Sequence, residues 1–383
     1  MTLIRVAIVG LASSDNTSWA SNAHLPYLLS PKGREKYQIV ALCNSSVEKA
    51  RHAIKVYDLP AETKAFGDPG ALAKDEDVDL VVCCTRVDVH YKTILPSILA
   101  GKAVYLEWPL AHDVKHSQEL VEAARMGIGS TIVGLQGRVA PVFVKIRELL
   151  EQQRVGKVVS SEFRAIDSPT KPDMTLPVDL KYFTQKEVGG NLFTIYFAHL
   201  WDQVQHVLGE VENLTSHFQI QHPNLKIVDP STRAVLETVQ SDVPDLIIVA
   251  GTIVESSNIA QKTATVSGHF RFGATFPGEP RLKWSINCEK GEIRLTAGSS
   301  LLQARGYDEP VVLEVYEFGT GKIEAIEWTW SNWQKDLPIA ARSVAELYER
   351  FAASSGDVPT IEDALHRHKQ LEVISFIANG IPK

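Results

Sequence analysis

The sequence predicts an α/β protein in two parts: an N-terminal doubly wound parallel sheet and a C-terminal domain with a large, mostly antiparallel open sheet. From residue 4 to residue 133, short apolar strands alternate with helices, which is typical of βαβ units. After Arg138 this alternation stops. Between Gly209 and Thr329, strand patterns follow one another without helices, which favours antiparallel pairing. We therefore expect one domain over residues 1–138 and another over residues 139–383, with the last helix able to pack back on the first domain.

The first domain is expected to contain five strands joined by helices. The strands are predicted at Ile4–Val9, Gln38–Leu42, Leu80–Thr85, Ala103–Leu106 and Thr131–Val133. The helices are predicted at Ala20–Leu29, from about Ser46 onward, at His90–Leu99 and at Val114–Met126. Residues 12–18 are expected to form a polar loop between the first strand and the first helix.

In the second domain, strand patterns dominate. Helices are predicted at Pro141–Gln152, Asn191–Leu208, Ile339–Ala352 and Ile361–Ala378, and strands at Lys157–Ile166, Leu246–Val254, Ala264–Phe272, Leu282–Cys288, Ile293–Thr296, Val311–Tyr316 and Ile323–Trp330. Asp167–Leu180 contains prolines and is expected to be a surface loop. Gly291 is available for a positive φ in a hairpin turn. Thr360 is expected to cap the last helix, and Gly380 to end it.

Composition and charge exclude several classes of partner. The formal net charge is −7 and no dense run of Lys or Arg occurs, which argues against a nucleic-acid-binding surface. No apolar stretch approaches the roughly 18–20 residues of a membrane span, and the N-terminus leads into a strand rather than a signal peptide. The 4 cysteines are too few for a disulfide framework in a chain of this length. We expect a cytoplasmic protein that binds a small molecule.

The first strand ends at Gly10, and a strand, a glycine turn and a helix N-terminus together are able to bind a phosphate. Ala12 takes the place of the second glycine of the usual dinucleotide fingerprint, and the loop up to Trp19 is longer than usual. Gly10, Leu11, Ala12 and Trp19 are therefore candidate cofactor residues. The alternative is an ordinary strand–loop–helix connection.

The second strand is followed by Asn44, Ser45 and Ser46, where an NAD site usually has an acid that binds the ribose. The uncharged Asn44 does not repel a 2′-phosphate, and Ser45, Ser46 and Arg51 are able to contact one. This pattern favours NADP over NAD, although a plain polar loop has the same composition.

The strand Ala103–Leu106 runs into Glu107, Trp108 and Pro109, and it must stop there because proline cannot donate to a ladder. In an open parallel sheet, ligands bind beyond the carboxyl ends of the strands, so Glu107 and Trp108 are placed where chemistry is expected. An indole is neither acid nor base near neutral pH, but it offers one N–H donor and a flat face. Trp108 is expected either to cover a nicotinamide or substrate ring or simply to fill the strand end.

Several motifs occur in the order of a known family. Gly10, Thr85–His90 and Glu107–Ala111 each follow a predicted strand, and with them the chain resembles the Gfo/Idh/MocA family of glucose–fructose oxidoreductase and inositol dehydrogenase. Within that family it is most similar to the fungal galactose co-repressor-like subgroup. The residues that carry this second likeness are Gly134–Arg138, Gly189 and Gly190 followed by His199, and Val243–Asp245.

The resemblance implies a Rossmann domain that binds NAD or NADP, with Thr85, Arg86, His90 and Gln136 among the cofactor residues. It also implies that the second sheet forms a homodimer.

In the dehydrogenases of the family, a lysine and a His–Asp pair move the proton. Here Trp108 stands at the lysine position, His199 at the histidine position and Ile195 at the aspartate position. His199, on a helix beside Asp202, is thus the candidate proton-transfer residue, with a satisfied core histidine as the alternative.

Other side chains are candidates for the substrate. Arg138 at the domain junction is able to hold a carboxylate or a phosphate oxygen, or else to form an interdomain salt bridge. Tyr182 and Tyr196 are further possible proton donors. No metal site is expected, because His199 and His206 are about 10.5 Å apart along a helix and the pair His112 and His116 supplies only two ligands.

Together these features predict an NAD(P)-dependent oxidoreductase that transfers a hydride to or from a small metabolite, in fungal secondary or carbohydrate metabolism. The short loops of the chain fit an enzyme. The missing lysine and aspartate fit a non-catalytic, dinucleotide-binding transcriptional regulator of the co-repressor type, whose partner is a protein. A non-redox enzyme that uses the same cleft is a further alternative.

Overall fold

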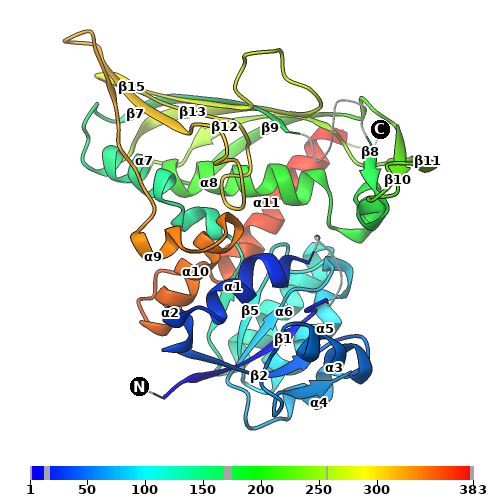
Figure 1. The fold of residues 1–383 in the computed structure, drawn as a ribbon. Coiled ribbons are helices and arrows are strands. Elements are labelled where there is room, and N and C mark those ends of the chain that lie inside the picture. Colours follow the sequence, from blue (N-terminus) through cyan, green and yellow to red (C-terminus); the bar gives the residue numbers. More distant parts are fainter. Residues whose placement is uncertain (1, 13–17, 168–174, 256–257, 380–383) are drawn as a thin grey trace. The chain divides into compact units, whose positions relative to one another are not determined.

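Six parallel strands form the sheet of the first compact unit in the computed structural model, which describes residues 2–12, 18–167, 175–255 and 258–379 (Figure 1). The strands are β1 Ile4–Val9, β2 Tyr37–Cys43, β3 Lys64–Phe66, β4 Leu80–Cys83, β5 Ala103–Leu106 and β6 Thr131–Val133. Their order, β3-β2-β1-β4-β5-β6, is that of a doubly wound dinucleotide-binding sheet, in which the strand order reverses beside β1. The predicted Rossmann sheet is confirmed.

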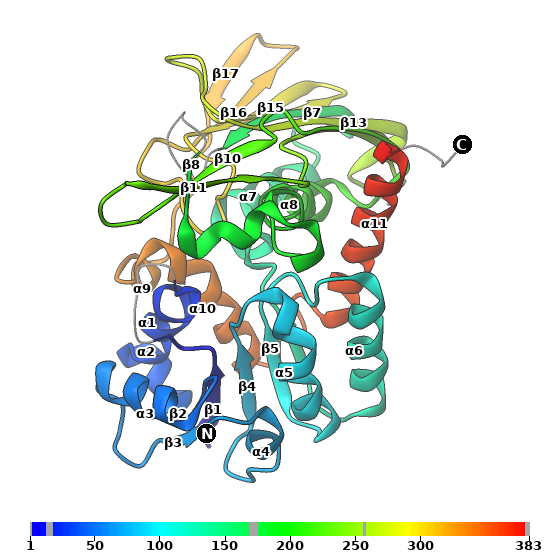
Figure 2. The ribbon, with the colours of Figure 1, turned by 90° about the vertical axis from the view of Figure 1, so that its right-hand side faces the viewer.

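Helices from both ends of the chain pack on this sheet. The helices of this unit are η1 Ala20–His24, α1 Leu25–Leu28, α2 Pro31–Arg34, α3 Val47–Val56, α4 Pro69–Ala73, α5 Val87–Leu99, α6 Val114–Met126, α9 Asn332–Lys335, α10 Ile339–Ala352 and residues 361–369 of α11 Ile361–Asn379. In Figure 2, α5 and α6 lie side by side next to β5. The first unit thus comprises Met1–Gln136 and Trp330–Lys369, and the second comprises Gly137–Thr329 and Gln370–Lys383. The sequence predicted a boundary at residue 138 and a last helix able to pack back on the first domain, but it did not assign the segment from Trp330 to the end of α10 to the first unit.

Side-chain caps determine where several helices begin. Ser46 and Asp113 each accept a hydrogen bond from the backbone N–H three residues further on, at 3.2 Å and 2.7 Å. Thr360 and Asp363 cap α11 reciprocally, each side chain accepting from the backbone N–H of the other residue, at 2.8 Å and 3.2 Å. The predicted starts of α3, α6 and α11 are therefore confirmed. Gly380, the predicted end of α11, lies outside the described residues.

Two predicted helices differ in their first turns. The helix expected at 20–29 is a π-helix, η1, followed by α1, and the helix expected at 191–208 is a π-helix, η5 Leu192–Phe197, followed by α8 Ala198–Leu208. A single π-helical turn changes the spacing of apolar residues too little to be distinguished from an α-helix in the sequence. The short elements α2, β3 and α4 were not predicted, because three to five residues carry little periodicity. Within the predicted loop 12–18, residues 13–17 lie outside the described residues.

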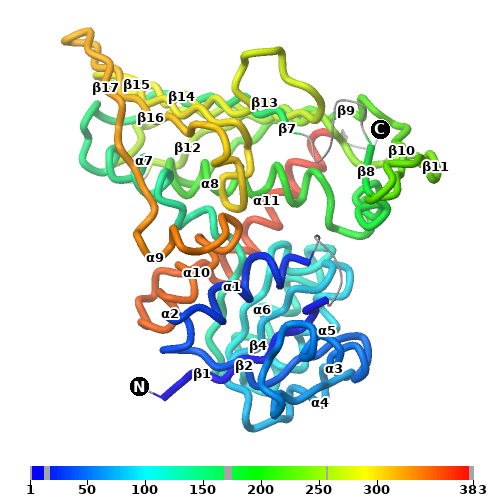
Figure 3. Tube along the Cα trace, viewed as in Figure 1, coloured from blue at the N-terminus to red at the C-terminus, as the bar shows by residue number. Residues whose placement is uncertain are grey.

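The second unit is built on an eight-stranded sheet with the order β17-β16-β15-β14-β7-β13-β12-β9. Its strands are β7 Val158–Asp167, β9 Val211–Gln219, β12 Leu246–Ile253, β13 Ala260–Phe272, β14 Leu282–Cys288, β15 Gly291–Ala297, β16 Val312–Glu317 and β17 Lys322–Ala325. Only β7 and β13 pair in parallel among these strands, so the predicted mostly antiparallel sheet is confirmed. The tube in Figure 3 shows β15, β16 and β17 gathered at one end of it.

Helices cover one face of this sheet. Phe163 of β7 contacts Trp201 of α8, and Trp284 of β14 contacts Phe143 of α7 Pro141–Glu151. On the other face, alternate residues of β13 and β14 are at least partly exposed, in keeping with the period of two of a strand. The exposed residues of β13 and β14 are polar.

The hairpin between β14 and β15 corrects one prediction. Cys288 pairs with Gly291, so the turn consists of Glu289 and Lys290, and Gly291 does not have a positive φ. Glycine is needed there for another reason, since a Cβ would lie 2.3 Å from the carbonyl oxygen of Tyr316 on β16.

Other strand predictions were incomplete. The loop expected at 167–180 contains β8 Thr175–Pro177, which pairs with β10 Asn224–Val228 and through it with β11 Val235–Gln240, while residues 168–174 lie outside the described residues. Almost every residue of β11 is exposed, so the strand has no alternating apolar pattern. The strand expected at 323–330 ends at Ala325 in β17.

Among the described helices, none is both long and apolar enough to cross a membrane.

Candidate functional site

The turn after β1 requires glycine at position 10. Gly10 has a φ of +92°, and a Cβ there would lie 2.9 Å from Cγ2 of Thr85 and 3.0 Å from the backbone of Cys84. Thr85 comes just after β4, so the turns that follow β1 and β4 touch at the carboxyl edge of the sheet. This edge is where parallel sheets bind ligands. Beside it, Leu11 is buried and Ala12 is exposed.

The turn between β2 and α3 lies against the same edge. The side-chain amide of Asn44 donates to the carbonyl oxygen of Leu11 at 2.9 Å, which links this turn to the Gly10 turn. Ser46 caps α3, whereas Ser45 and Arg51 are exposed. A polar ligand at this position would meet hydroxyl groups and a cation, and no carboxylate from residues 43–47.

His90 links the turn after β4 to the segment after β5. Its Nε2 lies 2.7 Å from the carbonyl oxygen of Thr85, and its Nδ1 lies 2.9 Å from that of Pro109. Burial lowers the pKa of His90, so the ring is neutral and donates to one of the two carbonyls. Arg86, also a predicted cofactor residue, is exposed, and its guanidinium pairs with Asp88 at 2.6 Å. His90 thus braces the backbone of the predicted site.

Glu107, a predicted catalytic residue, is enclosed by the protein. It is buried, its Oε1 lies 2.8 Å from Nε2 of His24, and Nδ1 of that ring lies 2.8 Å from the hydroxyl of Tyr348. A Cβ at Gly134 would lie 2.5 Å from the carboxylate, so this side chain fits only against glycine. The hydrogen bonds that join Glu107, His24 and Tyr348 connect the end of β5 to η1 and α10.

Trp108 does not face the exterior. Its side chain is 5% exposed, and its ring contacts the imidazole of His368 on α11, with centroids 4.6 Å apart. Two other predicted cofactor residues carry buried polar atoms that have no hydrogen-bond partner among the described residues, namely Nε1 of Trp19 and Oε1 of Gln136. Because an unsatisfied buried group costs about 1–3 kcal/mol, these atoms are suited to a polar ligand.

The remaining candidates belong to the second unit. His199 lies on α8 and is buried. One helical turn further, Asp202 accepts two hydrogen bonds from the guanidinium of Arg138, at 3.0 Å and 2.7 Å. The fork of Arg138 is therefore occupied by Asp202, a residue of the same unit. The geometry before His199 also differs from the prediction, because the π-helix η5 joins residues i and i+5, so that Ile195 is not placed by a four-residue count.

The two tyrosines differ in their surroundings. Tyr196 is buried, the guanidinium of Arg305 lies 5.7 Å from its ring centre, and burial raises the pKa of its hydroxyl. Tyr182 is only half-buried and packs edge-on against Phe183, at 5.0 Å between ring centres. Of the two, Tyr182 is the more accessible to a ligand.

One cluster brings three possible metal ligands together where the sequence predicted two. The ligand atoms of His112, Asp113 and His116 lie within 4.8 Å of one another. The Asp113 carboxylate also caps α6 and lies 3.1 Å from Nε2 of His112 and 2.8 Å from Nδ1 of His116. Hydrogen bonds within the cluster account for this arrangement.

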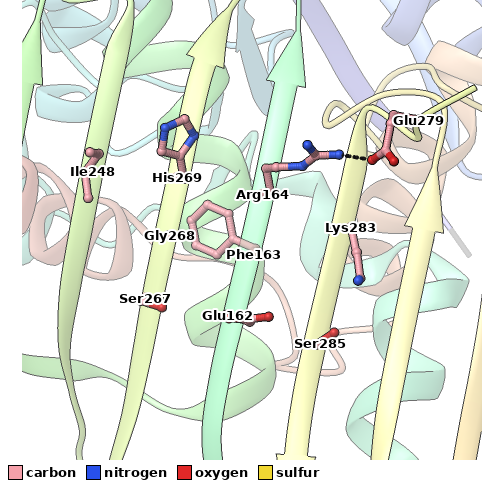
Figure 4. Close-up of a pocket in the computed structure, with 10 residues that line it drawn as sticks. All are labelled: Glu162, Phe163, Arg164, Ile248, Ser267, Gly268, His269, Glu279, Lys283 and Ser285. Carbon is pink, nitrogen blue, oxygen red and sulfur yellow. Dashed lines mark hydrogen bonds and ion pairs between the residues drawn. The ribbon is translucent and has the colours of Figure 1, made fainter. Parts of the chain in front are cut away.

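The open face of the eight-stranded sheet carries a hollow of about 440 Å³ (Figure 4). His269, Arg164 and Lys283 are direct cross-strand neighbours in it, and Arg164 pairs with Glu279. A second row is formed by Ser267, Glu162 and Ser285. Most of the side chains that line the hollow are polar, although Phe163 and Ile248 also line it, and none of them is a predicted site residue.

Sequence reasoning missed His24, Tyr348 and His368, which contact Glu107 and Trp108. None of the three stands out from its neighbours in the sequence, and His368 lies in a run of polar residues from His366 to Gln370. Only the packing of chain segments far apart in the sequence shows these contacts.

The comparisons with known proteins extend over the whole chain. Residues 4–135 match the family described as "Oxidoreductase family, NAD-binding Rossmann fold", and residues 141–297 match "Gal80p, C-terminal domain". The chain is 30% identical over 375 residues to dehydrogenase aclE of Aspergillus oryzae, covering 97% of this chain and 95% of that protein. It is 27% identical over 312 residues to the galactose/lactose metabolism regulatory protein GAL80 of Kluyveromyces lactis, covering 78% of this chain and 65% of that protein. A crystal structure of a super-repressor mutant of Gal80p from Saccharomyces cerevisiae has a TM-score of 0.84 at 21% identity, covering 99% of this chain and 96% of that chain.

Proposed function

Because the chain belongs to the Gfo/Idh/MocA oxidoreductase family, with a C-terminal domain of the Gal80p type, we propose that it is an NAD(P)-dependent oxidoreductase acting on a small organic metabolite. The observation that carries this proposal is the Gly10 turn, which packs on Thr85 at the edge where the strand order reverses. Similarity over nearly the full length to a dehydrogenase supports the redox activity.

The residues present at this edge fit a dinucleotide. A backbone turn without a Cβ at Gly10 allows close approach of a phosphate, and the buried polar atoms of Trp19 and Gln136 are able to bind its polar groups. When bound, the nicotinamide supplies or accepts the hydride. The chain's own contribution is to hold the cofactor through Gly10, Leu11, Ala12 and Thr85, and to cover the nicotinamide ring with the indole of Trp108.

We propose that the preferred cofactor is NADP. Ser45 and Arg51 are exposed beside the turn after β2, and Asn44 is uncharged. A 2′-phosphate therefore meets a hydroxyl and a guanidinium rather than a carboxylate, and Arg presents several N–H donors to phosphate oxygens.

We propose His199 as the residue that transfers the substrate proton. With the indole at position 108 unable to act as an acid, the imidazole of His199 is proposed to donate or accept the substrate proton. An activated acceptor such as an imine or an enone needs less acid assistance than an alcohol, so the substrate class is a carbonyl-derived, conjugated or imine compound. Tyr182 is proposed to bind it.

A second candidate function is a non-catalytic regulator that binds the dinucleotide and a protein partner. The similarity to GAL80 proteins favours it, as does the tryptophan at position 108. The regulator and the enzyme share the same cofactor site, so only turnover separates them.

We also propose that the open face of the eight-stranded sheet joins two copies of the chain. Arg164 and Lys283 lie near Glu162 on this face, so that across a two-fold axis the cations of one copy are able to meet the carboxylate of the other. Sedimentation velocity should give a dimer for the wild-type protein and a monomer for Ser267→Arg, which places a large charge at the centre of this face.

The experiment that tests the enzyme is a cofactor and turnover assay on one preparation. NADPH at about 100 times its Kd should stabilise the protein by about 2.7 kcal/mol. Loss of nicotinamide absorbance with a panel of ketones, imines and enones should then identify the acceptor. His199→Ala should retain the stabilisation and lose turnover.

The other outcomes are equally clear. Stabilisation without turnover on any compound supports the regulator. Stabilisation by neither NADPH nor NADH contradicts the proposed cofactor site, and an unchanged kcat in His199→Ala removes that residue from the reaction.

A further inference from the structure

His368 is a buried histidine whose ring lies against Trp108. Its side chain is 7% exposed, the two ring centroids are 4.6 Å apart, and their planes are inclined by 44°. It comes from α11, 258 positions after Leu110 in the chain, and both residues belong to the first unit.

A hydrogen bond fixes the orientation of this imidazole. Nε2 of His368 accepts from the backbone N–H of Leu110 at 3.1 Å, so the ring proton resides on Nδ1. Burial lowers the pKa of His368 to about 3, which keeps the ring neutral at physiological pH. The imidazole is thus held by the segment whose indole it contacts.

The helix that carries His368 is itself held by the sheet. The backbone N–H of Val133 in β6 donates to the carbonyl oxygen of Pro359 at 2.9 Å, and the backbone N–H of Ile361 donates to the hydroxyl of Thr131 at 3.3 Å. With the reciprocal cap between Thr360 and Asp363, these bonds fix the first turn of α11. His368 lies two turns further on, so its position follows from the edge of the parallel sheet.

We propose that His368 is a positioning residue that sets the plane of the Trp108 indole, and through it the affinity of the cofactor site for the nicotinamide. The effect on nicotinamide affinity rests on the proposed function, whereas the effect on the orientation of the indole does not. The second side-chain torsion of tryptophan has a broad, roughly two-fold preference, so the groups packed around the ring decide its plane. The neutral imidazole restricts rotation about this torsion from one side because it is fixed both by Leu110 and by α11.

The test compares His368→Leu, which removes the acceptor and the ring, with His368→Gln, whose side-chain oxygen is able to accept from Leu110. The Kd for NADPH is measured by energy transfer from tryptophan to the reduced nicotinamide, and the near-ultraviolet circular dichroism of the free protein reports the indole environment. His368→Leu is expected to raise the Kd about tenfold, which corresponds to about 1.4 kcal/mol. His368→Gln should recover most of the affinity.

Two controls separate positioning from a general effect on folding. His366→Leu changes an exposed histidine of the same helix and should leave the Kd within twofold of the wild type. In a Trp108→Ala background, His368→Leu should add less than twofold, because a residue that acts through the indole has nothing left to act on.

The proposal is overturned if His368→Leu folds normally and binds NADPH with an unchanged Kd, or if its effect persists in full without Trp108. Should His368→Leu fail to fold, His368→Gln is compared with His368→Asn, since only glutamine reaches the place of Nε2. Equal affinities of these two variants count against the proposal.

Cofactor binding by the wild-type protein distinguishes a failure of the positioning role of His368 from a failure of the proposed function. If it binds neither NADPH nor NADH, the proposed function fails. The circular dichroism difference between His368→Gln and His368→Asn, measured without cofactor and compared with Trp108→Ala, then still decides whether His368 orients the indole: a difference supports the proposal, and identical spectra overturn it.

Discussion

At the scale of single residues, Gly10 makes the sharpest prediction. A side chain at its φ of +92° costs about 1–2 kcal/mol, and the Cβ of alanine would also lie 2.9 Å from Thr85. Gly10→Ala should therefore lower the free energy of unfolding by at least that amount and weaken NADPH binding, measured by urea denaturation and titration. Gly319→Ala is the matched control, because a Cβ at Gly319 meets nothing within 4 Å. Equal stability of the two variants would contradict the geometry.

Arg51 tests the cofactor preference. Arg51→Ala removes an exposed cation beside the turn after β2, so it should weaken NADPH binding about tenfold and leave NADH binding unchanged, as measured by fluorescence titration. Lys55→Ala, one turn further along α3 and also exposed, should affect neither cofactor. A similar loss for NADPH and NADH would show that Arg51 does not bind a 2′-phosphate.

These residues also show how far sequence reasoning reaches. The need for glycine at position 10 was predictable, because this residue directly follows an apolar strand that begins a series of βαβ units. The reason for glycine at position 291 was not predictable, because the group that a Cβ would meet there is the carbonyl oxygen of Tyr316 on a neighbouring strand. The partners of Glu107 were equally hidden, since His24 and Tyr348 lie 83 positions before it and on a helix near the end of the chain.

At the scale of elements, the segment after β5 is braced by two buried neutral imidazoles, His90 and His368. Burial lowers both pKa values, that of His368 to about 3, whereas an unfolded histidine titrates near 6.5. Below pH of about 6.5 the unfolded chain therefore binds more protons than the folded one. The free energy of unfolding should therefore fall as the pH decreases below about 6.5, by up to about 1.4 kcal/mol per pH unit for each histidine until its folded-state pKa is reached, which for His368 is about 3. Above pH of about 6.5 the two histidines should not change the stability.

Urea denaturation between pH 7.5 and pH 5 measures this slope. His368→Gln should reduce it, because glutamine does not titrate, while His366→Gln on the exposed side of α11 should reproduce the wild-type slope. Parallel slopes for wild type and His368→Gln would mean that His368 is not held neutral by burial.

Elements with strong local signals were predictable, and the others were not. Apolar periodicity predicted the bounds of α6 and α10, Val114–Met126 and Ile339–Ala352. The strand β11 escaped because nearly all of its residues are exposed, and η1 and η5 were read as ordinary helix because their apolar spacing tolerates a wider turn. The wide turns matter for the candidate site, since η1 follows Trp19 and η5 precedes His199.

At the scale of the whole molecule, the first unit is discontinuous in the chain. Tyr348 of α10 is fully buried, and its ring lies 5.4 Å from that of Tyr27, 5.2 Å from that of Tyr37 and 5.1 Å from that of Tyr105. The first half of the sequence shows a complete βαβ series, so nothing in it indicates that residues 330–369 are needed to cover these rings. Local sequence patterns therefore indicate a domain boundary only near residue 138, where the βαβ series ends.

The last prediction follows from this cluster. Without Tyr348, three aromatic side chains of the first unit lose a covering ring, and each buried aromatic side chain contributes about 1.5–3 kcal/mol to a domain stability of only about 5–15 kcal/mol. A fragment of residues 1–136 should therefore lack a cooperative urea transition. Residues 1–136 joined by a flexible Gly/Ser linker to residues 330–369 should regain one, because the linked chain restores the ring cluster and the bond between Val133 and Pro359. If the shorter fragment unfolds as cooperatively as the linked chain, with the same dependence on urea, the C-terminal helices do not stabilise the parallel sheet.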